Sequence, residues 1–341
     1  MIGLKRVPNP PAKSIPLMKA EYPMRVPKFL ITGGAGFIGS NLVHYLQNEA
    51  NSESDTPETL VFDALTYAGK MENLDNLRFP KKNTFIHADV TNAKAVDEAV
   101  SACDAVFHLA AESHVDRSIS NPSIFLETNV LGSLNVLESC RRFGKRVVLV
   151  STDEVYGSLD VEFADENFPL KPSSPYSASK AAADLLGISY FKTFNTDIVI
   201  TRCSNNYGPR QYPEKLIPQT IKKILSDKKI PVYGTGDNIR DWIHVEDHCS
   251  GLILAMNFGV KGNVYNFGDV DKITNIEIVK LLLSITNKRD DLIEFVTDRL
   301  GHDFRYALDS TKAKQELGWA PNKSIAKNLA EIVDWYQTQG A

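Results

Sequence analysis

A glycine-rich turn, TGGAGFIGS at Thr32–Ser40, constrains the fold of this chain more than any other feature. It follows the short apolar run Lys28–Thr32 and opens Phe37–Asn48, whose apolar residues recur at helical spacing. Glycines let such a turn bend sharply and approach a phosphate, and the helix N-terminus presents amide groups and a positive dipole to the anion. The pattern therefore predicts the pyrophosphate site of a dinucleotide in a Rossmann-type domain. The residues predicted to contact the dinucleotide are Gly33, Gly36, Phe37, Ile38 and Gly39.

Strand-like and helix-like segments alternate from Lys28 to about Thr201. The strands are almost continuously apolar, which is typical of a parallel sheet covered on both faces. We therefore expect an α/β fold, with a Rossmann-type doubly wound parallel sheet and a smaller C-terminal substrate-binding region. The further strands are expected at Thr59–Phe62, Thr84–His87, Ala105–Leu109, Arg146–Val150 and Ile198–Thr201, and long helices at Ser123–Arg142 and Tyr176–Lys192.

The expected domain limits follow from changes in composition. Residues 1–27 hold six prolines and no continuous apolar core, so they are expected to form a flexible tail, with a transit peptide as the alternative. Residues 28–202 are expected to form the dinucleotide-binding domain. Loops rich in Asn, Gly, Pro and Arg follow, so residues 203–341 are expected to be mainly substrate-binding, with segments at about 240–267 returning to the first domain.

Charge and cysteine content exclude several classes of function. A net charge of -4 gives no support for a nucleic-acid partner, and no apolar run is long enough to span a membrane. The four cysteines are scattered without a CxxC pair, which favours a reducing, cytoplasmic setting over a disulfide framework or a zinc site. His244 and His248 are four residues apart, but no third metal ligand is suggested. We expect no metal there, and a helix N-terminus at 245–247 instead.

Acidic residues after the second and third strands indicate which dinucleotide is bound. Asp63 follows the second strand, where a carboxylate accepts bonds from ribose hydroxyls and repels a 2′-phosphate. NAD is therefore favoured over NADP, and the alternative is that Asp63 is a simple turn residue. Asp89 and Val90 follow the third strand and are expected near the adenine.

The candidate catalytic residues lie at a strand end and on the following helix. Tyr176 and Lys180 form YxxxK, and residues four apart share a helix face, so the ammonium is expected to stabilise a phenolate that acts as a base. Asp153 and Glu154 follow a strand that ends near Thr152. An adjacent acid and base suit an elimination reaction, and the alternative is a pair of capping or turn carboxylates.

Taken together, these motifs resemble the extended short-chain dehydrogenase/reductases, and more narrowly the dTDP-glucose 4,6-dehydratase family. The resemblance extends from Lys28 to the C-terminus, with Leu300, Phe304 and Arg210 as departures from residues frequent in that family. The motifs that carry it are GGAGFIG, HLAAESHVDRS, STDEVYG, SPYSASK, RCSNNYGPRQYPEKLIP, VYGTGDNIRDWIHVEDH, VYNFGD and DRLGHDFRYALD.

The resemblance implies an NAD-dependent hydro-lyase of deoxysugar biosynthesis, which converts dTDP-glucose to dTDP-4-keto-6-deoxyglucose. Tyr176 would take the C4 hydroxyl proton while a C4 hydride passes to NAD, with Thr152 bonded to the C4 oxygen and Lys180 orienting the ribose. Glu154 would take the C5 proton, Asp153 would protonate the departing C6 hydroxyl, and the hydride would return to C6. The alternatives are a UDP-sugar 4,6-dehydratase, a 4-epimerase, a decarboxylase or a catalytically silent NAD-sensing protein.

The resemblance also implies the substrate contacts and the assembly. It places Ala110 against the cofactor and predicts a homodimer through the helices Ser123–Arg142 and Tyr176–Lys192. For any single arginine among the substrate contacts, the alternative is a solvated surface charge. The predicted substrate-binding residues are Ser113, His114, Asn205, Lys215, Arg240, Asn275, Arg299 and His302.

Overall fold

The computed structural model describes residues 26–160, 163–298 and 302–338. Its main sheet contains β1 (Lys28–Thr32), β2 (Glu58–Asp63), β3 (Asn83–His87), β4 (Ala105–His108), β5 (Arg146–Thr152), β6 (Ile198–Cys203) and β10 (Val264–Phe267). These strands lie in the order β10-β6-β5-β4-β1-β2-β3, and every neighbouring pair is parallel. The strand order reverses between β1 and β4, which is where ligands bind in such sheets. The expected doubly wound parallel sheet is confirmed.

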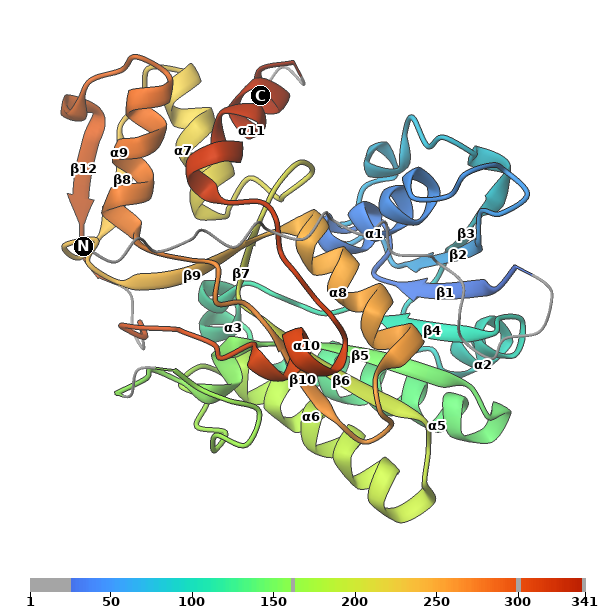
Figure 1. Cartoon of the computed structure of the whole chain (residues 1–341). Helices are drawn as coiled ribbons and strands as arrows, with labels where there is room; N and C mark the ends of the chain where they lie inside the picture. The colour runs from blue at the N-terminus through green and yellow to red at the C-terminus, as the bar shows by residue number, and fades with distance from the viewer. Residues whose placement is uncertain (1–25, 161–162, 299–301, 339–341) are drawn as a thin grey trace, which may run out of the picture.

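Helices cover both faces of this sheet (Figure 1). α1 (Phe37–Asn48) packs against α8 (Val245–Phe258) on one face, and α2 (Ala93–Ser101) packs against α5 (Ser133–Phe143) on the other. Alternate residues of each strand enter the two cores: Ile31 lies in the first and Leu30 in the second. Because both faces are buried, the strands read as continuous apolar runs rather than as alternating ones.

The helix at Phe37–Asn48 has the predicted bounds, whereas the one predicted at Ser123–Arg142 is not regular. It consists of α4 (Pro122–Phe125), a π-helical turn η3 (Leu126–Gly132) and α5. At the end of the turn, a Cβ on Gly132 would lie 2.5 Å from Val90, so only glycine lets the helix approach that closely. α6 spans Pro175–Phe194 and begins with a capping box formed by Ser174 and Ser177.

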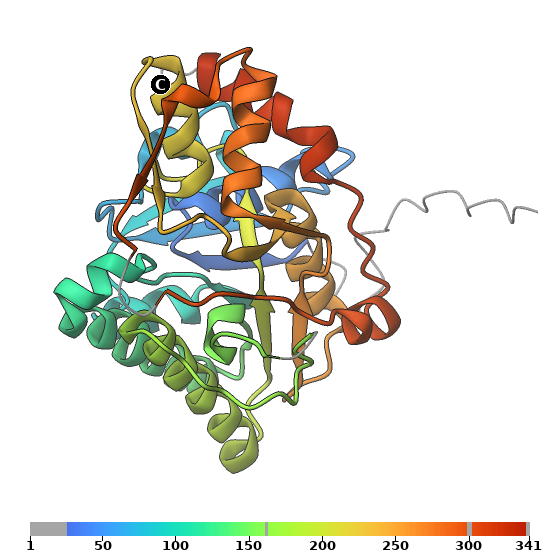
Figure 2. The ribbon, with the colours of Figure 1, turned by 90° about the vertical axis from the view of Figure 1, so that its left-hand side faces the viewer.

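The smaller region has a core of its own. The sheet β11-β9-β7 and the pair β12-β8 belong to it. Their strands are β7 (Asn205–Tyr207), β8 (Ile230–Tyr233), β9 (Ile239–His244), β11 (Asp271–Thr274) and β12 (Ile293–Val296), and the helices are α7 (Leu216–Leu225), α9 (Asn275–Ile285) and α11 (Ile325–Thr338). Thr274 and Glu277 form a capping box at the start of α9. In both views these helices lie at the opposite end of the molecule from α6 (Figure 1 and Figure 2).

The chain crosses between the two regions more than once. β10 pairs with β6 in the main sheet, and α8 packs on α1. The segment that includes α10 (Thr311–Glu316) and Trp319 also returns to the core of the main sheet, which the sequence analysis did not anticipate. Trp319 is almost fully buried there and donates its indole N–H to the Asp247 carbonyl over 2.9 Å.

Two further observations concern the described parts of the chain. Within them, every helix is too short or too polar to cross a membrane. The four cysteines are free thiols, and all four are buried.

Candidate active site

A cleft lies at the carboxyl ends of the main-sheet strands, between the sheet and the smaller region. It consists of two adjoining cavities that share four lining residues. The first cavity is lined by the glycine turn and the strand ends, and the second mainly by residues of the smaller region. The shared residues are Glu154, Asn205, Gln211 and Lys215.

The glycine turn forms one wall of the first cavity. Gly33 has a φ of +68°, and a Cβ there would lie 2.7 Å from the Ala110 amide nitrogen. A Cβ on Gly39 would overlap the Gly33 carbonyl oxygen, so a larger residue there would force the turn out of this shape. Gly36 caps α1 without a side-chain hydrogen bond. The amide groups in the first turn of a helix have no hydrogen-bond partner within the helix itself. These features fit the pyrophosphate of NAD.

Asp63, the predicted ribose contact, lines the same cavity. Its carboxylate accepts bonds from the Ala35 amide over 2.9 Å and from the Leu65 amide over 2.8 Å. Burial raises the pKa of Asp63, while these backbone bonds lower it. Two oxygens can accept about four bonds, so this carboxylate has capacity for a ribose diol as well. The predicted adenine contacts Asp89 and Val90 line the same cavity.

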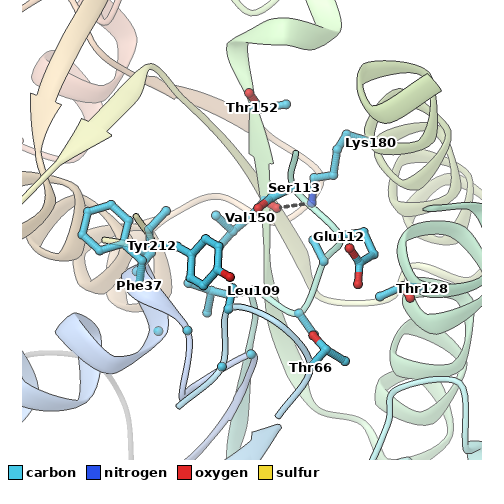
Figure 3. Close-up of a pocket in the computed structure, with 18 of the residues that line it drawn as sticks. Phe37, Thr66, Leu109, Glu112, Ser113, Thr128, Val150, Thr152, Lys180 and Tyr212 are labelled. Carbon is cyan, nitrogen blue, oxygen red and sulfur yellow. Dashed lines mark hydrogen bonds between the residues drawn. The ribbon is translucent and has the colours of Figure 1, made fainter. Parts of the chain in front are cut away.

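Tyr176 and Lys180 lie one turn apart on α6 and line the first cavity. Lys180 Nζ donates to the Val150 carbonyl over 2.7 Å (Figure 3). Burial lowers the pKa of Lys180, and burial together with the charge of Glu154 raises the pKa of Tyr176 well above its usual range. Burial thus opposes the phenolate in the protein alone, and the role of Lys180 in making Tyr176 a usable base stays a prediction.

The predicted acid and base lie where β5 ends. Thr152 begins a short 3₁₀ turn at Asp153–Tyr156, accepts a bond from the Glu154 amide and donates to Asp153 Oδ1 over 3.1 Å. Asp153 is 3% exposed, and within the described residues its Oδ2 atom has no hydrogen-bond partner. Burial, followed by the charges of Glu154 and Asp241, raises the pKa of Asp153 well above its usual range. Burial thus favours the protonated form of Asp153, beside the more exposed side chain of Glu154.

The predicted substrate residues gather at the two cavities, except for Arg299, which lies outside the described residues. Asn205 and Lys215 line both cavities and Ser113 lines the first. Lys215 Nζ donates to the Ser113 carbonyl over 2.8 Å. The other four, His114, Arg240, Asn275 and His302, line the second cavity.

Arg240 is not a solvated surface charge. It is only 7% exposed, and its guanidinium donates to the Ile239 and Asp303 carbonyls, both over 2.9 Å. The guanidinium also lies 4.5 Å from the centre of the Tyr306 ring. These contacts orient a planar cation along the wall of the second cavity, a geometry suited to diphosphate oxygens.

Several residues that line the first cavity were not predicted from the sequence. Tyr67, Gln211 and Tyr212 lie in irregular loops, where no periodic pattern marks them. Glu112 follows β4 and is tied to the π-helical turn, because its amide donates to Asn129 Oδ1 over 2.8 Å. Figure 3 shows Glu112 on the α6 side of the cavity and Tyr212 on the side of Phe37. The position of Glu112 just after a strand was the one sequence pattern that could have predicted it as a lining residue.

The two histidines of the predicted helix N-terminus have structural roles. His244 caps α8 by accepting a bond from the Glu246 amide, which confirms the expected helix start. His248 Nδ1 lies 2.9 Å from Asn206 Oδ1. Burial lowers the pKa of His244 to about 4 and that of His248 to about 3, so both rings are neutral.

Comparisons with known proteins agree on one family. The family model described as GDP-mannose 4,6 dehydratase matches residues 30–332. A dTDP-glucose 4,6-dehydratase from Streptomyces antibioticus is 45% identical over 314 residues, which cover 92% of this chain and 93% of that protein.

Solved structures agree with this. DesIV, the dTDP-glucose 4,6-dehydratase from Streptomyces venezuelae with NAD bound, is 44% identical, with a TM-score of 0.88 over 91% of this chain and 97% of that chain. The Bacillus anthracis dTDP-glucose 4,6-dehydratase in complex with NAD is 41% identical, with a TM-score of 0.84 over 92% and 97% of the two chains. The family resemblance of the motifs is confirmed: this chain belongs to the nucleotide-sugar 4,6-dehydratases of the extended short-chain dehydrogenase/reductase family.

Proposed function

We propose that this chain is an NAD-dependent dTDP-glucose 4,6-dehydratase, a hydro-lyase that forms dTDP-4-keto-6-deoxyglucose. The proposal depends on one observation, which is that the buried Asp153, whose pKa is raised by burial, lies next to Glu154 in the same cavity as Tyr176 and Lys180. A simple alcohol oxidation or epimerisation at C4 needs no such acid and base. Relatives named dTDP-glucose 4,6-dehydratase, at 45% and 44% identity, support the same reaction.

Residues of the first cavity would hold NAD. Gly33, Gly36 and Gly39 would cradle the pyrophosphate, and Asp63 would accept bonds from the adenosine ribose. When bound, NAD accepts the hydride that leaves C4 of the sugar and returns it to C6, so the overall reaction is redox-neutral.

Oxidation at C4 uses Thr152, Tyr176 and Lys180. Tyr176 takes the C4 hydroxyl proton, and Thr152 bonds the C4 oxygen. Lys180 uses one of its three donors on the Val150 carbonyl, and the remaining ones would be available to the nicotinamide ribose and to the tyrosine. Burial raises the pKa of Tyr176 in the protein alone, and positive charge from Lys180 and the bound cofactor would lower it.

Elimination of water uses the carboxylate pair. A ketone at C4 acidifies the C5 proton, which Glu154 removes. Asp153 gives its proton to the C6 hydroxyl, which leaves as water, and the C5 position is later reprotonated. The different surroundings of the two side chains support these roles, because burial raises the pKa of Asp153 whereas Glu154 is more exposed.

The second cavity would hold the nucleotide diphosphate of the substrate. Arg240 and Lys215 would supply positive charge to the diphosphate, and His114, Asn275 and His302 line the same cavity. Asn205 lines both cavities, and its buried Oδ1 atom has no partner within the described residues, which makes it a suitable acceptor for a sugar hydroxyl.

We also propose a homodimer through the helices at Ser123–Arg142 and Tyr176–Lys192. Large apolar side chains on α3 (Val115–Ser120), α4, η3 and α6 are exposed, and an exposed apolar face of this kind marks an interaction site. They are Ile119, Ile124, Leu126, Leu131, Leu185 and Phe194. Light scattering after size exclusion should give twice the chain mass at micromolar concentration, and a monomer would contradict the proposal.

Mass spectrometry of the products from a panel of nucleotide sugars tests the function. With dTDP-glucose and NAD, we expect a product that has lost one water. Water loss only from a UDP-sugar would change the substrate, an unchanged mass with an epimerised sugar would indicate an epimerase, and loss of carbon dioxide a decarboxylase. No turnover of any sugar, with NAD bound, would indicate a catalytically silent protein.

A further inference from the structure

Three segments meet at the first cavity through contacts that the proposed chemistry does not require. The loop after β2 contributes Tyr67, the segment after β4 contributes Ser113 and Arg117, and the loop before α7 contributes Tyr212 and Glu214. Three of these residues, Tyr67, Ser113 and Tyr212, line the cavity. The first two segments belong to the main sheet, whereas the third leads into the smaller region.

Arg117 is at the centre of these contacts. Its guanidinium lies 3.9 Å from the centre of the Tyr67 ring. The same group makes two hydrogen bonds to Glu214, one of them from Nε to Oε2 over 3.1 Å. Bonding to Arg117 lowers the pKa of Glu214, so both side chains are charged at neutral pH. A single arginine thereby joins the two loops that flank the cavity.

Further contacts close the same arrangement. The Tyr67 hydroxyl accepts a bond from the Ser113 amide over 3.3 Å, and the Tyr67 and Tyr212 rings meet edge to face with centres 5.3 Å apart. Lys215 Nζ donates to the Ser113 carbonyl over 2.8 Å. Each of these contacts joins two protein groups, so none depends on a bound molecule for its existence.

We propose that Tyr67, Arg117, Tyr212 and Glu214 form a latch that controls the passage of the dinucleotide into and out of its cavity. The inference rests on the proposed function, in which the hydride taken from C4 must return to C6 of the same sugar. A cofactor that left between the two steps would abort the turnover. The latch ties the loops of the main sheet to the smaller region beside the cavity, and so keeps the cofactor in place during that interval.

A latch and a direct contact predict different kinetics. Weakening a protein–protein latch lowers the barrier to opening, so NAD enters and leaves faster by the same factor and its Kd is unchanged. Loss of a side chain that binds NAD directly raises only the dissociation rate, and the Kd rises with it. The two rates together therefore separate the two roles.

The variant Arg117→Met tests the latch, because it removes the guanidinium and keeps the length of the side chain. Arg142→Met is the matched control, since Arg142 is also about two-fifths exposed, pairs with a carboxylate and lies near an aromatic ring, but does so on α5 outside the cavity. The dissociation rate is measured by exchange of bound NAD against excess labelled NAD in the holoenzyme. The Kd is measured by equilibrium dialysis.

We expect Arg117→Met to exchange NAD about five- to tenfold faster than wild type, as suits the loss of one cation–π contact and one ion pair, with a Kd within about twofold. Arg142→Met should exchange NAD at the wild-type rate. Equal exchange in both variants, or a Kd that rises with the dissociation rate, would overturn the latch while leaving the dehydratase proposal intact. Absence of NAD binding by wild type would overturn both. If Arg117→Met does not fold, Glu214→Gln breaks the same pair and takes its place.

Discussion

The buried ion pair between Arg202 and Asp184 leads to a prediction that links stability to the active site. Arg202 lies on β6 and Asp184 on α6, and their side chains are 3% and 0% exposed. The guanidinium donates to Asp184 Oδ2 over 2.8 Å and to the Tyr156 hydroxyl over 2.7 Å. Tyr156 lies two residues after Glu154, and Asp184 lies one turn after Lys180. The ion pair therefore joins the two segments that carry the proposed catalytic residues.

The variant Arg202→Met removes the guanidinium and keeps an apolar stem of similar length. Asp184 is then a buried carboxylate without its cation, and breaking a buried ion pair in this way costs about 3–5 kcal/mol. Since domains are stable by only about 5–15 kcal/mol, this is a large fraction of the total. The double variant Arg202→Met with Asp184→Leu removes both charges. It should lose less stability than Arg202→Met alone, because apolar replacement of a whole buried pair is often close to neutral.

Urea unfolding followed by tryptophan fluorescence gives the free energies needed for this double-mutant cycle. Arg142→Met is the control, since the Arg142–Asp97 pair is exposed and its loss should cost less than about 1 kcal/mol. The dehydratase rate of folded Arg202→Met should also fall, because the catalytic segments lose their common anchor. Two results would contradict this prediction. One is a loss of unfolding free energy in Arg202→Met no larger than that in Arg142→Met. The other is a loss in the double variant that equals the sum of the losses in Arg202→Met and Asp184→Leu.

Three further predictions follow from the site and its buried groups. Asp153→Asn and Glu154→Gln should each slow water loss about 10²- to 10⁴-fold but spare C4 oxidation, so that the near-ultraviolet absorbance of reduced nicotinamide accumulates; normal turnover in both variants would contradict the roles given to them. Gly39→Ala should weaken NAD binding at least about tenfold in equilibrium dialysis, because the new methyl group would overlap the Gly33 carbonyl oxygen and force the turn out of shape, and an unchanged Kd would argue against the turn as the pyrophosphate site. Burial lowers the pKa of His108 and of His248 to about 3, so the folded state favours their neutral forms, and the free energy of unfolding should fall as the pH drops from about 6.5 towards 3. His248→Gln should reduce the slope of the free energy of unfolding against pH by up to about 1.4 kcal/mol per pH unit. An unchanged slope would show that His248 titrates normally.

The parts of the fold and site that could be predicted depend on local sequence. A glycine turn between a strand and a helix has one main structural use, and the strand ends near Asp63 and Thr152 follow from the limits of apolar runs. Since all main-sheet strands are parallel, residues after those ends had to meet at one edge. The Thr274–Glu277 capping box is local too, since a threonine followed three residues later by a glutamate is a sequence pattern typical of a helix start.

The remaining features arise from contacts between distant segments. The π-helical turn at Leu126–Gly132 occurs where a helix meets Val90 and Glu112, and the helical spacing of the sequence does not reveal it. Trp319 returns to the main core from the far end of the chain, for which no periodic pattern exists. The raised pKa of Tyr176 depends on burial by several elements, so the YxxxK spacing alone does not reveal it.

We have proposed that one bound NAD carries hydride from C4 to C6 within a single turnover. Incubation with dTDP-glucose deuterated at C4 tests this transfer. The product is examined by mass spectrometry and proton NMR after incubation with the holoenzyme in ordinary water. We expect a 4-keto-6-deoxy product that carries the deuterium at C6. Deuterium that remains at C4, or that is found in free NADH instead of in the sugar, would contradict it.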